Sequence, residues 1–146
     1  MKALENMNEV IFPRSPKETM AGWAYLPRFV DKIRLSLAGQ LHADYQPNFA
    51  RKGFDAQWLT AAGLEADPFI EIVKNTLTDG EVCDWVRCHV STAKRESFNL
   101  WVLHYGADSD SEVQARLKLR KEQSGLAHRD DLRTFVDFID ADEKRS

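Results

Sequence analysis

The sequence predicts an all-α fold, a single compact domain of about seven or eight short helices. Apolar residues recur at spacings of three and four along most of the chain, which is the pattern of helices with one buried face. Three Ser/Thr-x-x-Glu patterns mark helix starts, and no alternating run is long enough to indicate a strand. With 146 residues, of which 43% are hydrophobic, the chain is long enough to bury a substantial core.

The chain begins with a segment that we expect to be flexible, residues 1–12, followed by one helical domain over residues 13–146. At the start of this domain, Ser15 precedes a proline and stands three positions before Glu18. That spacing has the form of a capping box, with proline at the first helical position. It predicts a short helix that ends at Gly22.

The second expected helix begins at Pro27 and ends at Gly39, because proline favours the first turn of a helix and glycine the position after the last. At about 100° per residue, one face of this helix is apolar and should pack on the core. The residues of this apolar stripe are Leu26, Phe29, Val30, Ile33 and Leu37.

The opposite face of the same helix is charged. Arg28, Asp31 and Lys32 point away from the stripe, and Leu35 falls in the middle of them. A leucine among charges indicates that this face is also partly covered, and covered charges need partners because burying an unpaired charge is costly. Asp31 could then pair with Arg28 or with Arg34, each three residues away. The alternative is a solvated face with one surface leucine.

Residues 40–53 form the one long irregular segment, interrupted by proline and glycine. This segment brings together an imidazole, a carboxylate and a phenol in His42, Asp44 and Tyr45. Such groups can perform acid–base chemistry if they converge. The alternative is an ordinary turn in which Asp44 shapes the backbone and Tyr45 anchors the segment to the core.

The rest of the chain is predicted to be helical. Glycines mark helix ends, and further capping boxes mark helix starts. The expected starts are Phe54, Asp67, Thr78, Ser91 or Thr92, Ser109 and about Asp131. The inward faces of these helices place three large side chains in the core: Leu77, Trp85 and Trp101.

The C-terminal residues 129–143 are rich in carboxylates. Asp130 or Asp131 is well placed to cap the last helix by accepting hydrogen bonds from its first amides. Asp137 and Asp140 share a face of that helix, and such a pair could contribute to a Mg²⁺ or Ca²⁺ site. No loop with regular ligand spacing is present, so pairing with basic residues is the preferred interpretation. The expected partners are Arg28, Lys32 or Arg34 of the second helix.

Composition limits the expected partners. The net charge is −3, so neither nucleic acid nor an anionic membrane is an expected partner. Basic residues do gather on one expected helix, where Arg116 and Arg120 share a face, but acidic residues interrupt them and no aromatic side chains interleave. We interpret this helix as having a solvated, charged face.

The two cysteines indicate a reducing compartment. Cys83 and Cys88 are five residues apart, which places them about 140° apart around a helix and makes a disulfide or a shared metal unfavourable. We see no signal peptide and no run of the ~18 apolar residues that a membrane span requires. We therefore expect a cytoplasmic protein with no cofactor, no metal and no membrane partner.

Three segments of the chain, in this order and spacing, resemble an uncharacterised family of small bacterial proteins, a domain of unknown function. The first segment comprises the two stretches 13–18 and 27–34. The second comprises 44–48 and 53–55, and the third is the single stretch 129–143. The set is specific, although each piece alone is weak. The resemblance implies a bacterial cytosolic origin and a single domain.

The chain also departs from the pattern of that family. Members often carry histidine where this chain has Gln46, and cysteines near Gln57 and Trp58. The family has no activity that would identify catalytic residues in this sequence.

For function, we expect a small non-enzymatic binding or interaction protein, because the sequence shows no recognisable nucleophile–base pair, metal-ligand set or phosphate-binding glycine loop. The alternative is an enzyme or small-ligand binder whose charged pocket comes from the 28–34 helix, the 42–48 loop and the C-terminal acidic helix. The partner would be a protein or a small anionic ligand. The two hypotheses differ in what they require of the fold. The ligand binder requires the three segments to meet around a concave pocket, whereas the interaction protein allows them to lie apart. The candidate binding residues are Arg28, Asp31, Lys32, Arg34, His42, Asp44, Tyr45, Asp137 and Asp140.

Overall fold

The computed structural model describes residues 10–107 and 110–145. Within these ranges it has seven α-helices and a small two-stranded sheet, which confirms the predicted compact, mostly helical domain. In chain order the elements are β1 (Thr19–Met20), β2 (Trp23–Ala24), α2 (Leu26–Leu37), the 3-10 turn η1 (Ala43–Tyr45), α3 (Gly53–Ala62), α4 (Ala66–Lys74), α5 (Asp79–His89), α6 (Arg95–His104), α7 (Ser111–Gln123) and α8 (Phe135–Asp142).

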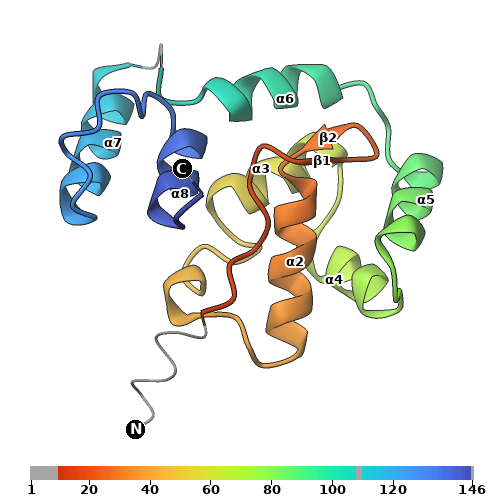
Figure 1. Ribbon diagram of the computed structural model, residues 1–146. Coiled ribbons are helices and arrows are strands. Elements are labelled where there is room, and N and C mark those ends of the chain that lie inside the picture. The colour runs from red at the N-terminus through yellow and green to blue at the C-terminus, as the bar shows by residue number, and fades with distance from the viewer. Residues whose placement is uncertain (1–9, 108–109, 146) are drawn as a thin grey trace, which may run out of the picture.

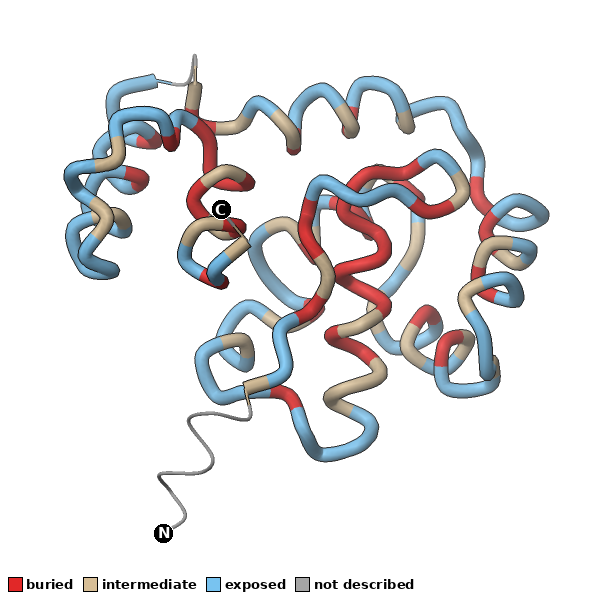
Figure 2. Tube along the Cα trace, in the orientation of Figure 1, coloured by how far each residue is buried: buried red, intermediate tan, exposed pale blue. Residues whose placement is uncertain are grey.

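The helices surround α2, which lies at the centre of the molecule (Figure 1). α4 and α5 lie on one side of it, α7 and α8 on the other, and α6 runs between the two sides. Figure 2 shows that β2 and the first half of α2 form the longest buried run of the described chain. None of the described helices is long and apolar enough to cross a membrane.

The prediction of a short helix ending at Gly22 is wrong, because the hairpin β1–β2 occupies that position. Ala21 and Gly22 have left-handed φ angles of 54° and 81°, which make the turn and exclude a continuing helix. Ser15 does not cap a helix either. Its hydroxyl accepts a hydrogen bond from the Lys17 amide at 3.1 Å and donates one to Asp140 of α8 at 3.0 Å.

One amide side chain of α6 fixes the hairpin against the body. Asn99 Oδ1 accepts a hydrogen bond from the Ala24 amide, and Asn99 Nδ2 donates one to the Gly22 carbonyl, each at 2.8 Å. These bonds satisfy backbone groups that the two short strands leave unpaired. They also hold β2 where Trp23 is fully buried.

The core is a cluster of aromatic rings between the hairpin, α2, α3 and α4. Trp58 of α3 is at its centre, with ring centroids 5.7 Å from Trp23, 5.9 Å from Phe29 and 4.9 Å from Phe69. Such tilted and edge-to-face contacts add to the stabilisation from apolar burial. The apolar stripe of α2 supplies most of the rest, through Leu26, Phe29, Val30 and Ile33.

Four residues expected in the core are not fully buried there. Leu37 is 47% exposed, because it is the last residue of α2 and the chain then turns away. Leu77 is 91% exposed, because α4 ends at Lys74 and leaves Leu77 in the connection to α5. Trp101 is 37% exposed and Trp85 is only half-buried, so each lies at the edge of a stripe whose smaller members, such as Val86 and Val102, are buried as expected.

Several helix boundaries predicted from local patterns are confirmed. Thr78 and Glu81 form the predicted capping box at the start of α5, with the Glu81 amide donating to Thr78 Oγ1 at 3.2 Å. Gly63 ends α3 in the left-handed conformation, with φ of 74°. Gly39 does the same after α2, and the Gln40 amide donates to a carbonyl of the last turn.

The last two helices begin later than expected. Ser109, the predicted start of α7, lies outside the described residues, and Asp110 caps α7 by accepting a hydrogen bond from Val113 at 2.9 Å. α8 is capped by Thr134, which accepts from the Asp137 amide at 3.1 Å. The prediction that Asp130 or Asp131 caps it is therefore wrong. Asp131 instead forms an ion pair with a neighbouring arginine.

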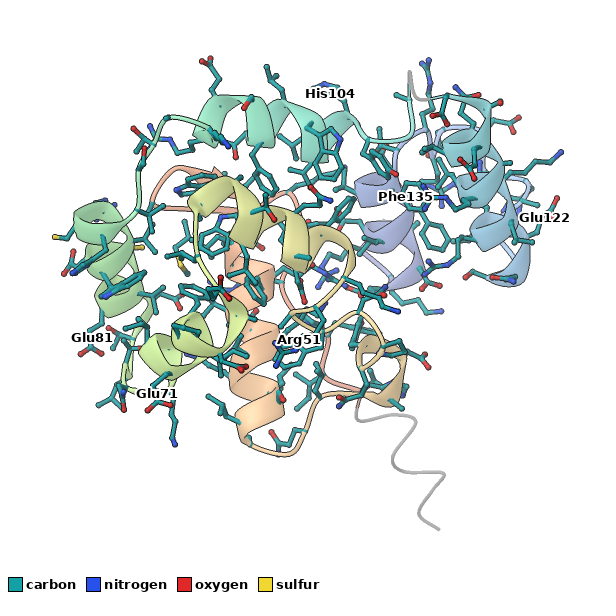
Figure 3. All side chains as sticks on the ribbon, turned by 180° about the vertical axis from the view of Figure 1, so that it is seen from behind. Arg51, Glu71, Glu81, His104, Glu122 and Phe135 are labelled. Carbon is teal, nitrogen blue, oxygen red and sulfur yellow. The ribbon has the colours of Figure 1, made fainter. Side chains whose placement is uncertain are left out.

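α7 and α8 bury a second, smaller apolar cluster, made of Val113, Leu117, Phe135 and Phe138. Figure 3 shows Phe135 on the part of α8 that lies beside α7. The cluster meets the main core through Phe54, which packs against both. The molecule therefore has two apolar centres joined along a seam. Cys83 and Cys88 are not bonded to each other.

We predict that the two kinds of tryptophan differ in their contribution to stability. Trp58→Ala should lower the free energy of unfolding by about 3–5 kcal/mol, because it leaves a large cavity in the core. Trp101→Ala should lower it by about 1 kcal/mol, since its ring is partly exposed. Urea titrations of both variants measure the difference, and equal losses would contradict the assignment of the core.

Candidate functional site

The charged face of α2 is covered, as one of the two interpretations of its sequence required. Arg28 is 4% exposed and Lys32 is 5% exposed, one helical turn apart. The segment before the hairpin, the C-terminal tail and Tyr45 cover them. Because two buried cations side by side are strongly unfavourable without counter-charges, carboxylates must reach this face from elsewhere in the fold.

Glu143, just after α8, supplies the partner of Arg28. The guanidinium donates two nearly parallel hydrogen bonds to the carboxylate, at 2.9 and 2.7 Å. This bidentate geometry is the strongest that an arginine and a carboxylate can form. Arg145 also donates to Glu143, at 2.5 Å, and to the Pro13 carbonyl, so the tail is tied to the segment that precedes the hairpin.

Asp55, in the first turn of α3, supplies the partner of Lys32. The carboxylate is 1% exposed and lies 2.9 Å from the Lys32 ammonium. It also accepts hydrogen bonds from the Tyr25 hydroxyl at 2.5 Å and from the Ala50 amide at 2.8 Å. Sequence reasoning missed Asp55 as a site residue, because an aspartate in the first turn of a helix already has a local reason to be there.

The predicted pairing of Asp31 with Arg28 or Arg34 is wrong. Asp31 receives two hydrogen bonds at 3.0 Å from the guanidinium of Arg14, whose segment crosses over α2. Arg34 pairs with Asp79 at the start of α5, at 2.7 Å. Pairs within one helix are weak, and partners from other elements meet these side chains in better geometry.

Tyr45, from the irregular segment, closes the buried cluster from the side. Its hydroxyl donates to Glu143 at 2.5 Å, and its ring centroid is 5.5 Å from the Arg28 guanidinium and 6.0 Å from the Lys32 ammonium. Cations over an aromatic face are attracted to it. His42 and Asp44 form a local turn beside it, in which the Asp44 amide donates to His42 Nδ1 at 3.1 Å.

Burial dominates the electrostatics of the cluster. It lowers the pKa of Lys32, and the neighbouring Arg28 lowers it further, despite the charge of Asp55. Burial alone would raise the pKa of Glu143, but the hydrogen bonds from Arg28 and Tyr45 bring it below its ordinary value. Burial and the bond to Glu143 raise the pKa of Tyr45, so this phenol stays protonated at neutral pH.

A cavity of about 830 Å³ lies along the seam between the two apolar clusters. Arg28, Lys32 and Tyr45 form one wall of it, and the turn at residues 42–48 forms the rim. The part of the chain around Phe12, which the sequence places in the flexible segment 1–12, also contributes to the wall. Residues 1–9 of that segment lie outside the described residues.

Aromatic rings form a second, continuous wall of the cavity. The ring centroids of Phe54 and Trp101 are 5.6 Å apart, those of Trp101 and Tyr105 are 4.9 Å apart, and those of Tyr105 and Phe135 are 5.4 Å apart. The rings come from α3, α6, the residue that follows α6, and α8. Because Trp101 is 37% exposed, this wall offers an apolar surface of rings set at angles to one another.

α7 contributes two arginines to the opposite side of the cavity. Arg116 donates to the Tyr105 hydroxyl at 2.8 Å and lies over the Phe135 ring, and Arg120 lies over the Phe138 ring. Within the described residues, neither guanidinium is paired with a carboxylate. The sequence shows both on one face of a helix, but that face was interpreted as solvated.

The structure divides the sequence-predicted candidates into two groups. Those that line the cavity are Arg28, Lys32, His42, Asp44 and Tyr45. Asp31 and Arg34 form ion pairs on another side of α2, as described above. Asp137 lies 2.7 Å and Asp140 3.8 Å from Lys17, so the expected pairing of these two carboxylates with α2 is wrong. Because α8 begins later than expected, these two carboxylates contact residues 15–17. Glu143, which follows the helix, pairs with α2 instead.

The described residues contain no group of three His, Cys, Asp or Glu side chains placed to hold a metal ion. What they do contain is a half-open cavity. A buried, paired charge cluster lies on one side of it, and an aromatic wall and two arginines lie on the other. This arrangement can bind a small molecule by stacking and by charge.

We predict that the Arg28–Glu143 pair is essential for stability. Glu143→Ala should lower the free energy of unfolding by about 3–5 kcal/mol, because it leaves a buried guanidinium without its carboxylate. Asp31→Ala is the control. It should cost about 1 kcal/mol or less, since its partner Arg14 is partly exposed and keeps Asp79. Urea unfolding measures both, and a small loss for Glu143→Ala would contradict the prediction.

Stability should also depend on the ionisation of Glu143. Its pKa is lower in the folded protein than in the unfolded chain, so the unfolded chain binds more protons in acid. The free energy of unfolding must then fall as the pH drops below about 4.3, the pKa of a glutamate in the unfolded chain, and on through the lower pKa of the folded protein. Glu143→Gln should flatten this fall in unfolding titrations between about pH 5 and pH 2. Glu122→Gln, an exposed change on α7, should leave it unaltered.

Comparison with known families shows which domain family the chain belongs to. Comparison with curated proteins finds no significant match. A family described as a domain of unknown function (DUF5069) matches residues 10–145, which include every residue of the cavity wall and both helices of the second cluster. The resemblance inferred from the sequence is thus supported as an uncharacterised domain family. The chain belongs to the DUF5069 family.

Proposed function

We propose that the protein binds a small organic anion in the cavity between α2, α3, α7 and α8. The observation that carries this proposal is a cavity of about 830 Å³ whose wall includes two arginines without a carboxylate partner among the described residues. The α2 helix, the 42–48 loop and the C-terminal tail meet around this concave space. Of the two hypotheses drawn from the sequence, that meeting favours a small-ligand binder over an interaction protein.

The size of the cavity matches that of small-molecule sites, and part of its lining is aromatic. Such sites enclose about 300–1,000 Å³ and combine aromatic or apolar walls with a few polar groups that orient the ligand. Here Phe54, Trp101 and Tyr105 provide the aromatic wall. A ligand with a planar, apolar body would stack on these rings.

The charges that remain unpaired select an anion. Arg28 and Lys32 are neutralised by Glu143 and Asp55, so they leave little net charge for a ligand. Arg116 and Arg120 are not neutralised, and guanidinium groups recognise carboxylates and phosphates through two donors at once. Asp44 and Asp142 also line the cavity and would repel an anion placed near the rim. We therefore place the anionic group beside α7.

Other functions have less support. The large apolar side chains exposed in the described residues lie on different elements, such as Leu77 before α5, Leu100 on α6 and Leu119 on α7. A nucleic-acid interface is not favoured by the net charge of −3. A bacterial cytoplasm remains the expected location, on the basis of the unpaired cysteines and the family resemblance.

Binding measurements with defined anions test the proposal. Benzoate, 4-carboxybenzyl alcohol, adenosine monophosphate and inorganic phosphate should be compared by calorimetry and thermal unfolding. We expect at least one aromatic anion to bind, and a ligand at 100 times its Kd would add about 2.7 kcal/mol of stability. Inorganic phosphate, which has no ring to stack, should bind more weakly.

Charge removal on α7 provides the matched control. The double variant Arg116→Gln, Arg120→Gln should weaken binding by at least about tenfold, because each arginine provides a charge-assisted hydrogen bond. Lys118 lies on the same helix but does not line this cavity. The variant Lys118→Gln removes one positive charge there, so it should bind the anion like the wild type. Equal affinities for all three proteins, or no binding of any aromatic anion, would contradict the proposal.

A further inference from the structure

Lys32 is a buried amine in the wall of the cavity. Its side chain is 6% exposed, its ammonium lies 2.9 Å from Asp55, and the ring of Tyr45 stands beside it at 6.0 Å. Besides pairing with Asp55, Lys32 is one of the residues that line the cavity. A buried ion pair is also often no more stable than well-packed apolar side chains, so stability alone does not account for it.

Burial lowers the pKa of Lys32, although the Asp55 carboxylate raises it. Arg28 is a second buried cation one helical turn away, and it opposes the charge of the ammonium. Asp55 does not depend on Lys32 for its hydrogen bonds, because Tyr25 and Ala50 each donate one to it. The carboxylate therefore stays satisfied when the amine loses its proton. Desolvation beside another cation is the way in which proteins activate a lysine as a nucleophile.

We propose that Lys32 forms an imine with the carbonyl group of an aldehyde or ketone that also carries a carboxylate or phosphate. This inference rests on the proposed function, because Arg116 and Arg120 hold the anionic end of the same molecule. The substrate class is a carbonyl compound with a flat, apolar body between its two polar ends, which matches the aromatic wall between α7 and α2.

The step balances without an oxidant or reductant. The ammonium first releases a proton to water. The neutral Nζ attacks the carbonyl carbon, so that a C–N bond forms and the carbonyl oxygen gains a proton to become a hydroxyl. That hydroxyl then leaves as water, taking up a proton while the nitrogen loses its remaining hydrogen, and the C=N bond of the imine forms. Hydrolysis reverses each step and regenerates Lys32.

Reductive trapping on the intact protein tests this proposal. The probe is 4-carboxybenzaldehyde, an aromatic aldehyde with one carboxylate, in the presence of sodium cyanoborohydride, which reduces the imine to a stable amine. Peptide mapping by mass spectrometry then gives the rate at which each lysine is modified. We expect Lys32 to react at least about tenfold faster than Lys52, an exposed lysine on the rim of the same cavity. Its rate should reach half of its maximum below the ordinary lysine pKa of about 10.4.

Variants and an unreactive analogue separate the possible outcomes. Lys52→Arg should keep the fast modification, and Lys32→Arg should abolish it. The wild-type peptide map decides the question even if Lys32→Arg does not fold. Modification of Lys32 no faster than that of Lys52 would overturn the imine proposal.

The aldehyde-free analogue 4-carboxybenzyl alcohol tests the cavity independently. If it binds in an Arg116-dependent way and Lys32 is not trapped, the imine proposal fails and the proposed function stands. If the alcohol does not bind and Lys32 is not trapped, both fail for this class of ligand. Fast trapping of Lys32 that slows in the double variant Arg116→Gln, Arg120→Gln supports both together.

Discussion

The fold depends on one electrostatic constraint: α2 carries two buried cations one turn apart, and each must meet a carboxylate from another element. Asp55 reaches Lys32 from α3, and Glu143 reaches Arg28 from the end of the chain. These two contacts set the position of α3 and of the C-terminal tail relative to α2. Tyr45 bonds to Glu143, so the irregular segment is held by the same cluster. Removing one carboxylate therefore disturbs several elements, because it leaves a buried cation without its counter-charge.

The cavity follows from how the two apolar clusters are built. The main core is completed by the hairpin and α2 to α6, whereas Val113, Leu117, Phe135 and Phe138 bury one another between α7 and α8. The two clusters share Phe54, but the charged face of α2 lies between them and cannot be packed with apolar side chains alone. An open space with charge on one side and aromatic rings on another is the result. Its chemistry is thus decided by residues that the fold already requires.

Local sequence patterns predicted the parts of the fold that local interactions decide. The capping box at Thr78 and the glycines at the ends of α2 and α3 satisfy backbone groups within a few residues, so the pattern contains the whole interaction. The same kind of pattern failed at Ser15, because its hydroxyl is taken by Asp140 from the far end of the chain. It also failed for α8, where a threonine at 134 caps the helix three residues after the expected aspartate. Long-range partners of this kind have no local signature.

The candidate site shows the same limit more sharply. Lys32 and Lys118 are both lysines on helices, and neither the residue type nor the place on a helix separates a buried amine in a cavity wall from a side chain in solvent. The leucine at position 35 did indicate cover over the α2 face, and the cover exists, yet it gave no information on which carboxylates provide it. Arg116 and Arg120 are exposed, as expected, but the sequence contains no sign of their aromatic partners, because Phe135 and Phe138 lie on another helix. Sequence periodicity predicts which residues share a face, but only the tertiary fold decides what that face meets, and the chemistry of a site is set at that second level.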